Sequence, residues 1–145
     1  MIGIISLILD LVINKIISNK SIFLPLLSII SIIYIRHDHK YYYKVLLLGL
    51  VYDILFSYIY FINVIIFFII GFLLNKILKR NELIYYIFIS ILVITIYQLL
   101  LYIFLYVLGY NSYSFNELLY IFYHYYLLNI IYSIIIYYIK IRPLK

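Results

Sequence analysis

The stretch VLLLGLVYDILFSYIYFINVIIFFIIGFLLN, residues 45–75, decides the fold. Asp53 is the only charged side chain among its 31 residues. As one helix it would be about 46 Å long, whereas the hydrocarbon core of a bilayer is about 30 Å thick. The stretch therefore either crosses a membrane at a steep tilt or reverses direction within its length.

The rest of the chain has the same apolar character. Its 145 residues are 69% hydrophobic and 11% charged, whereas about a quarter of the residues in a soluble protein are charged. There are too few polar side chains to cover the surface of a small water-soluble domain, so we expect an integral membrane protein. The absence of Cys excludes disulfides, thiol catalysis and iron–sulfur clusters.

The distribution of basic residues favours a reversal. If the chain turns back near residues 57–61, six spans result, and three basic segments lie on one side of the membrane. These are residues 36–44, 76–82 and 140–145, which hold nine of the eleven Lys and Arg residues. Basic residues collect in short cytoplasmic loops, and such dispersed clusters indicate membrane orientation rather than nucleic-acid binding. We therefore predict an all-α polytopic protein with six transmembrane helices and both termini in the cytoplasm.

The expected spans form a single transmembrane domain covering residues 1–145. The first span includes Asp10 and Lys15, so a tilted or interfacial helix is the alternative there. The second has only 15 residues and would reach about 22 Å, so we expect flanking basic residues to snorkel or the bilayer to thin. The approximate spans are residues 2–17, 21–35, 45–58, 62–75, 83–109 and 118–139.

Asp53 is the deepest acid in the predicted bundle. It lies nine residues after Lys44, near mid-bilayer, where an unpartnered carboxylate costs at least about 3 kcal/mol. It should therefore face the bundle interior, either as a coupling, binding or packing-specificity residue or as an acid that fixes helix orientation. Gly49, one turn earlier on the same face, would let a neighbouring helix approach it closely.

Other polar and small residues are interpreted as structural. Gln98 and Asn129 are deep amides that can hydrogen-bond between helices for roughly 0.6 to 2 kcal/mol. Asn63 marks the start of the fourth span, and Gly71 is a close-packing point near its end.

No motif indicates catalysis. The pair His37 and His39 around Asp38 has no third ligand nearby, so we expect a solvated loop and no metal site. Neither G-x-S-x-G nor a phosphate-binding glycine pattern occurs. We therefore expect a non-enzymatic protein without a cofactor; an intramembrane lipid-processing enzyme using Asp10 or Asp53 is the least favoured reading.

Three segments together resemble the MreD family of rod shape-determining proteins. The segment GLVYDIL, residues 49–55, followed by Asn63 and by IGFL, residues 70–73, resembles that family's central pattern G-L-x-x-D-L-x-x-G-x-x-x-G-x-[NH]. Tyr97 and Gln98 begin a segment similar to its Y-[EQ]-L-L, and Leu128-Asn129 before an apolar helix and a basic tail resembles its last span. The resemblance covers essentially the whole chain.

The chain departs from the family pattern in two ways. Ser57 and Phe61 stand where the family commonly has Gly after the acid, so the predicted helix break lacks its usual glycine. Small residues are also scarce where neighbouring helices should meet.

The resemblance implies a multi-pass scaffold of the bacterial cytoplasmic membrane that takes part in cell elongation, cell shape and lateral peptidoglycan synthesis. It implies binding to the single-span protein MreC and, through MreC, a connection to MreB, RodA and the transpeptidase partner of RodA. Membrane lipids are the other partners that it implies. The site residues it implies are Gly49, Asp53, Asn63, Gly71, Tyr97, Gln98 and Asn129. The family's fold is similar to the substrate-binding subunits of energy-coupling-factor vitamin transporters, which makes a vitamin-binding subunit the alternative.

Overall fold

The computed structural model describes residues 1–17, 26–57, 61–109 and 115–144. Regular structure in these residues is entirely helical, which confirms the all-α prediction. The helices are α1 (Ile2–Ile17), α2 (Leu27–Tyr34), α3 (Tyr41–Phe56), α4 (Ile62–Ile77), α5 (Leu83–Val107) and α6 (Phe115–Ile136). A π-helical turn, η1 (Tyr137–Ile141), and a short 3-10 helix, η2 (Arg142–Leu144), follow α6.

The helices differ in length. Among the described residues, α5, with 25 residues, is the one helix long and apolar enough to cross a membrane. Helix α4 and the segment Tyr126–Ile141 are apolar but shorter. The expected second span, residues 21–35, is helical only from Leu27, so α2 has 8 residues and is about 12 Å long; residues 21–25 of that prediction lie outside the described part.

The chain reverses between α3 and α4, which pack side by side as an antiparallel hairpin. Phe61, the N-cap residue just before α4, has φ +72° and ψ −8°, in the left-handed region that glycine favours. A non-glycine residue therefore makes the turn without the glycine that the resemblance led us to expect. Helix α3 begins four residues before the expected span because Tyr41 is buried and its hydroxyl donates to the Gly71 carbonyl oxygen at 3.1 Å.

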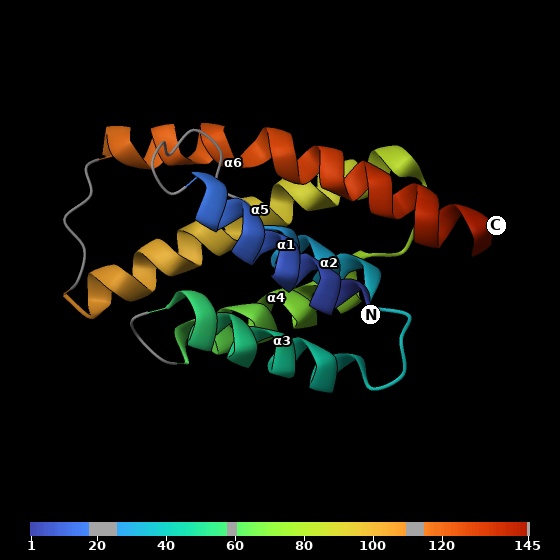
Figure 1. Ribbon diagram of the computed structural model, residues 1–145, viewed down its shortest axis with the longest axis horizontal. Coiled ribbons are helices and arrows are strands. Elements are labelled where there is room, and N and C mark those ends of the chain that lie inside the picture. Colours follow the sequence, from blue (N-terminus) through green and yellow to red (C-terminus); the bar gives the residue numbers. More distant parts are fainter. Residues whose placement is uncertain (18–25, 58–60, 110–114, 145) are drawn as a thin grey trace.

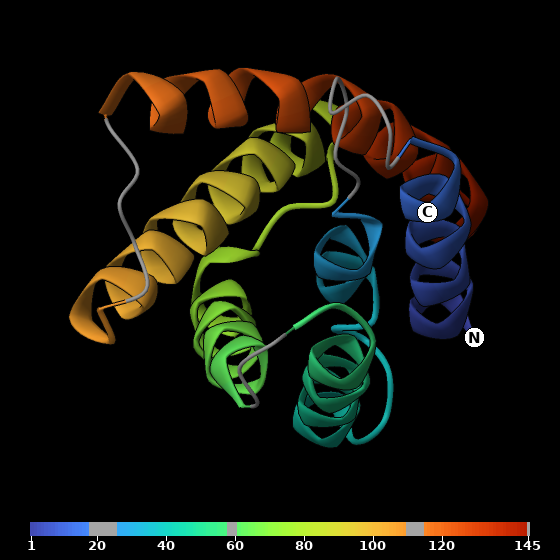
Figure 2. The same cartoon turned by 60° about the vertical axis from the view of Figure 1, so that its left-hand side comes forward.

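Helix α2 forms the centre of the bundle. All eight of its residues are buried, and it contacts α1, α3, α4, α5 and α6 (Figure 2). A helix this short is not stable by itself, so its neighbours must hold it in place.

Buried serines line the contacts around this central helix. The hydroxyls of Ser90 and Ser133 lie 2.6 Å apart and join α5 to α6, and the Tyr34 hydroxyl donates to the Ser133 carbonyl oxygen at 2.6 Å. Ser6 joins α1 to α6 through the Tyr132 hydroxyl at 2.7 Å. The expectation that small residues are scarce between helices is thus wrong, because serines provide them. The fully buried serines are Ser6, Ser28, Ser31, Ser90 and Ser133.

The three basic segments lie at one end of the bundle, together with both chain ends (Figure 1). Lys140 in η1 pairs with Asp38, between α2 and α3, at 2.9 Å. The Tyr137 hydroxyl donates to the carbonyl oxygen of Asn81, between α4 and α5, at 2.9 Å. These contacts fix the relative positions of segments that are distant in sequence.

Candidate functional site

The buried acid of α3 caps the first turn of α4. Asp53, which is 2% exposed, accepts hydrogen bonds from the Asn63 backbone N–H at 3.2 Å and the Val64 backbone N–H at 3.0 Å. The first N–H groups of a helix have no partner within the helix and carry partial positive charge. Asp53 therefore satisfies them from the preceding helix and holds the hairpin closed at this end.

A third helix joins this cap through an amide. The side-chain nitrogen of Asn63 donates to Asp53 at 2.9 Å, and its side-chain oxygen accepts from the Tyr97 hydroxyl of α5 at 2.8 Å. The Asn63 amide thus uses both of its ends, and α3, α4 and α5 share one buried network.

The two glycines of the resemblance lie in the same hairpin. A Cβ atom on Gly49 would lie 2.9 Å from the Cα atom of Val64 and 3.3 Å from the Asn63 carbonyl oxygen. A Cβ atom on Gly71 would meet Val45 side-chain carbons at 3.1 and 3.4 Å. Helices α3 and α4 are therefore close enough for glycine to be needed at Gly49, where the obstacle is backbone. At Gly71 a methyl group would fit only if the Val45 side chain shifted by a few tenths of an ångström.

The seven predicted site residues do not form one cluster. Gly49, Asp53, Asn63, Gly71 and Tyr97 lie together along the α3–α4 hairpin and its contact with α5.

The two deep amides behave differently from each other. Gln98 is buried, but its side-chain nitrogen has no hydrogen-bond partner among the described residues, so the expected inter-helix bond from that atom is not seen there. Asn129 lies elsewhere, on α6, where its side-chain oxygen accepts from the backbone N–H of Leu26 at 2.9 Å.

A shallow hollow opens beside the hairpin cap. Its volume is about 150 Å³, and among the described residues Asp53 is the one polar residue that lines it. Ile54 and Phe61, which border it, are 62% and 64% exposed. The hollow therefore offers an apolar surface beside an acid whose oxygens already accept hydrogen bonds from the protein itself. Its lining residues are Leu50, Asp53, Ile54, Phe61 and Val64.

A second buried acid was not identified as a site residue from the sequence. Asp10 of α1 is fully buried and accepts from the backbone N–H groups of Leu27 at 3.0 Å and Ser28 at 2.9 Å, and also from the Ser28 hydroxyl. It caps α2 as Asp53 caps α4. Pro25 indicates in the sequence that a helix starts nearby, because proline is frequent where a helix starts and rare inside one, but it does not show that Asp10 supplies the cap.

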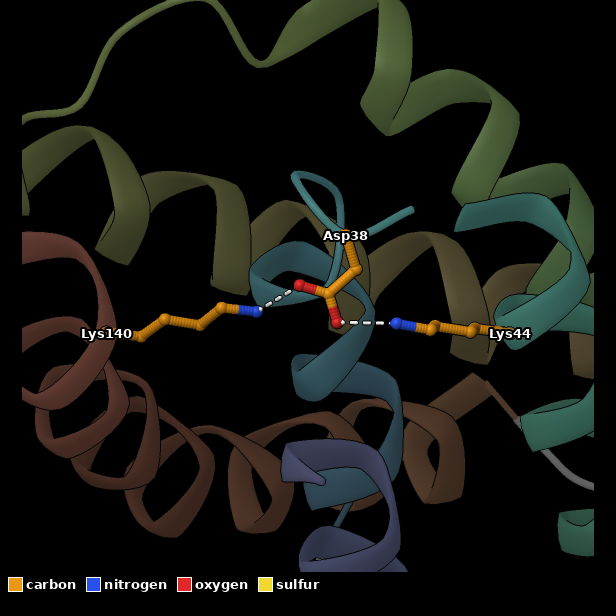
Figure 3. A network of polar contacts seen from close by, with 3 residues as sticks. All are labelled: Asp38, Lys44 and Lys140. Carbon is orange, nitrogen blue, oxygen red and sulfur yellow. Dashed lines mark hydrogen bonds and ion pairs between the residues drawn. The ribbon is translucent and has the colours of Figure 1, made fainter. Parts of the chain in front are cut away.

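The loop between α2 and α3 carries an ion-pair cluster at the basic end. Asp38 binds Lys44 at 3.0 Å and Lys140 at 2.9 Å (Figure 3). Partial burial opposes ionisation of Asp38, but hydrogen bonds from Lys140 and Lys44 outweigh it and lower the pKa of this carboxyl below its usual value. In the described part of the chain, His37 and His39 belong to no group of three residues able to bind a metal ion.

Comparisons with protein-family models, with curated proteins and with solved structures find no match to this chain. A functional proposal therefore rests on the residues and contacts described above.

Proposed function

We propose that this chain is a non-enzymatic scaffold of the MreD type, a multi-pass protein of the bacterial cytoplasmic membrane that binds MreC. Through MreC it would connect the MreB filament to RodA and its transpeptidase partner during cell elongation. The observation that carries the proposal is the convergence of Gly49, Asp53, Asn63, Gly71 and Tyr97 on one hairpin and its neighbour, because Tyr97 comes from a different part of the family pattern from the other four residues.

Six membrane crossings form part of this proposal. Helices α1, α3 and α4 have 16 residues each, or about 24 Å, and local thinning of the bilayer accommodates helices of that length. Helix α2 is about 12 Å long, less than half of the ~30 Å core, so the proposed second crossing also needs the residues that precede Leu27. The shared position of the three basic segments supports a common cytoplasmic side.

The partner helix would pack on the hollow beside Asp53. Helices associate within a membrane mainly by close packing, since lipid tails are as apolar as leucine. Ile54 and Phe61 expose apolar surface around the hollow, and the network of Asp53, Asn63 and Tyr97 holds the backbone beneath it. A rigid surface of this kind suits a packing partner because little order has to be gained on binding.

The same network weighs against the two alternatives. A vitamin-binding subunit or a lipid-processing enzyme would use polar groups that point at a ligand. Asp53, Asn63 and Tyr97 instead bond to one another, and the oxygens of Asp10 are directed at the first turn of α2.

Copurification tests the proposal. Tagged protein extracted in mild detergent should capture coexpressed MreC, and Ile54→Trp, which fills the hollow, should reduce capture at least about tenfold if the contact is worth more than about 1.4 kcal/mol. Ile131→Trp is the matched control, since Ile131 is also largely exposed but lies on α6. Failure of the intact protein to capture MreC would defeat the proposal, and equal loss in both variants would defeat the choice of surface.

A further inference from the structure

A second, larger apolar groove runs between α1 and α3. Its volume is about 470 Å³, and it extends from Asp38 and Lys44 at the basic end to Leu11 and Leu55. The two helices run in the same direction from that end (Figure 1). They approach each other where a Cβ atom on Gly3 would lie 2.8 Å from the Leu48 side chain. The groove is therefore apolar along its length and charged at one end.

The length of the groove matches a hydrocarbon chain of one leaflet. From Tyr43 to Leu55 the α3 axis rises about 18 Å, close to the depth of one leaflet, which is half of the ~30 Å core. An acyl chain ends near the middle of the bilayer, as the groove does, whereas a transmembrane helix continues through both leaflets.

The charged end of the groove is complementary to an anionic headgroup. Lys44 is 45% exposed and uses one ion pair, to Asp38, whose other oxygen is bound by Lys140. Two lysines thus share one carboxylate, and the group carries a net positive charge (Figure 3). Arg36 and Lys40 add two more cations to the same loop. Basic pockets at the cytoplasmic ends of transmembrane helices bind the phosphates of anionic lipids.

We propose that the groove between α1 and α3 holds one acyl chain of an anionic phospholipid of the cytoplasmic leaflet, with the lipid phosphate beside Lys44. The inference rests on the membrane orientation given under the proposed function, but it does not depend on MreC. A bound lipid would fill the space between α1 and α3 and would join the first helix to the hairpin.

Native mass spectrometry of the full-length protein tests this site. The protein is released from detergent micelles that contain equal amounts of phosphatidylglycerol and phosphatidylcholine. One phosphatidylglycerol molecule should remain bound. The preference over phosphatidylcholine, whose choline cation cancels its phosphate charge, should be about fivefold for each basic residue beside the headgroup. Lys44→Gln, an exposed change that leaves Lys140 paired with Asp38, should reduce that preference about fivefold.

Two tryptophan variants locate the lipid. Leu47 lines the groove, whereas Leu46, its neighbour on α3, does not, and both are partly exposed. Leu47→Trp should abolish retention of phosphatidylglycerol, and Leu46→Trp should leave it unchanged. Equal retention in the two variants would overturn the proposal, as would equal retention of the two lipids by the intact protein. A crosslink from this groove to the transmembrane helix of MreC would overturn it too, because the partner would then occupy the space.

Capture of MreC by the intact protein is scored separately from lipid retention. Lipid retention without MreC capture would overturn the proposed function and leave the lipid site standing. MreC capture without lipid retention would overturn the lipid site and leave the proposed function standing.

Discussion

Two buried acids, Asp53 and Asp10, perform the same task at two places in the bundle. Each accepts two backbone N–H groups from the first turn of a helix other than its own. Asp53 lies only ten residues before its partner Asn63, across one hairpin turn. Asp10 lies 17 residues before Leu27, and Asn129, 103 residues after Leu26, completes the cap from α6.

The difference shows how the helices depend on each other. Helix α4 has 16 residues and packs along the whole of α3, so its cap adds to contacts that already hold it. Helix α2 has 8 residues, all buried among other helices, so its first N–H groups are shielded from water. The cap from Asp10 should therefore matter more to stability than the cap from Asp53.

Replacing each of the two acids with alanine tests this difference, and the loss of stability should be the largest of those predicted. Asp10→Ala leaves two buried N–H groups and the Ser28 hydroxyl without their acceptor, and should lower the free energy of unfolding by at least about 3 kcal/mol. Asp53→Ala should cost about 1 kcal/mol less, because the packing of α3 on α4 remains. Thermal unfolding in detergent, followed by circular dichroism, measures both.

Asparagine at the same positions provides the control. Asp10→Asn and Asp53→Asn each keep one acceptor oxygen, so each should lower the free energy of unfolding less than the corresponding alanine variant. If Asp10→Ala unfolded at the temperature of the intact protein, the cap on α2 would have no energetic role and the comparison would fail.

The close approach of the hairpin helices gives the next largest effect. In Gly49→Ala the new methyl group would overlap the backbone at Val64, so the free energy of unfolding should fall by about 1 to 3 kcal/mol. Gly71→Ala should cost less, because the atoms it meets belong to the side chains of Val45 and Tyr41. Guanidinium titrations of the two variants in one detergent would rank them, and an equal or larger cost at Gly71 would contradict the close contact at Gly49.

The turn between the two hairpin helices should be improved by glycine. Phe61 has φ +72° and is 64% exposed, so its side chain adds little packing while its backbone is strained. Phe61→Gly should therefore raise the free energy of unfolding by about 1 kcal/mol. Lys40, just before α3, is the other described non-glycine residue with a positive φ, +60°. Lys40→Gly is therefore the matched variant for Phe61→Gly. A lower melting temperature for Phe61→Gly would show that its ring is held by contacts.

The ion-pair cluster at the basic end should have the smallest effect. Because the pKa of Asp38 is lowered in the folded protein, its stabilising contribution is present above the unfolded pKa of about 3.9 and is lost as the pH falls through the folded value. Asp38→Asn should cost about 1 kcal/mol or less at pH 7 and should remove that part of the acid dependence. Melting curves of the two proteins between pH 3 and pH 7 should therefore converge at the acid end, and a constant gap would contradict the assignment.

Sequence reasoning found the hairpin because its evidence is local. The distance from Asp53 to Asn63 is ten residues, and one acid in a long apolar run must face inward whatever its partner. The buried serines and the Asp10 cap were missed because their partners come from α2 and α6, and no pattern in one segment shows which distant segment it will meet. Gln98 shows a limit of the same reasoning, because a deep amide predicts a hydrogen bond, but the Gln98 side-chain nitrogen has no partner among the described residues.

Cysteine labelling tests the central claim, which is that the chain doubles back at the α3–α4 turn so that the basic segments share the cytoplasm. The chain contains no Cys, so Lys79→Cys and Asn116→Cys each introduce a single reactive thiol. In intact bacterial cells, a membrane-impermeant maleimide should label Asn116→Cys and leave Lys79→Cys unlabelled until the membrane is permeabilised. Labelling of Lys79→Cys from outside the cell would contradict the account.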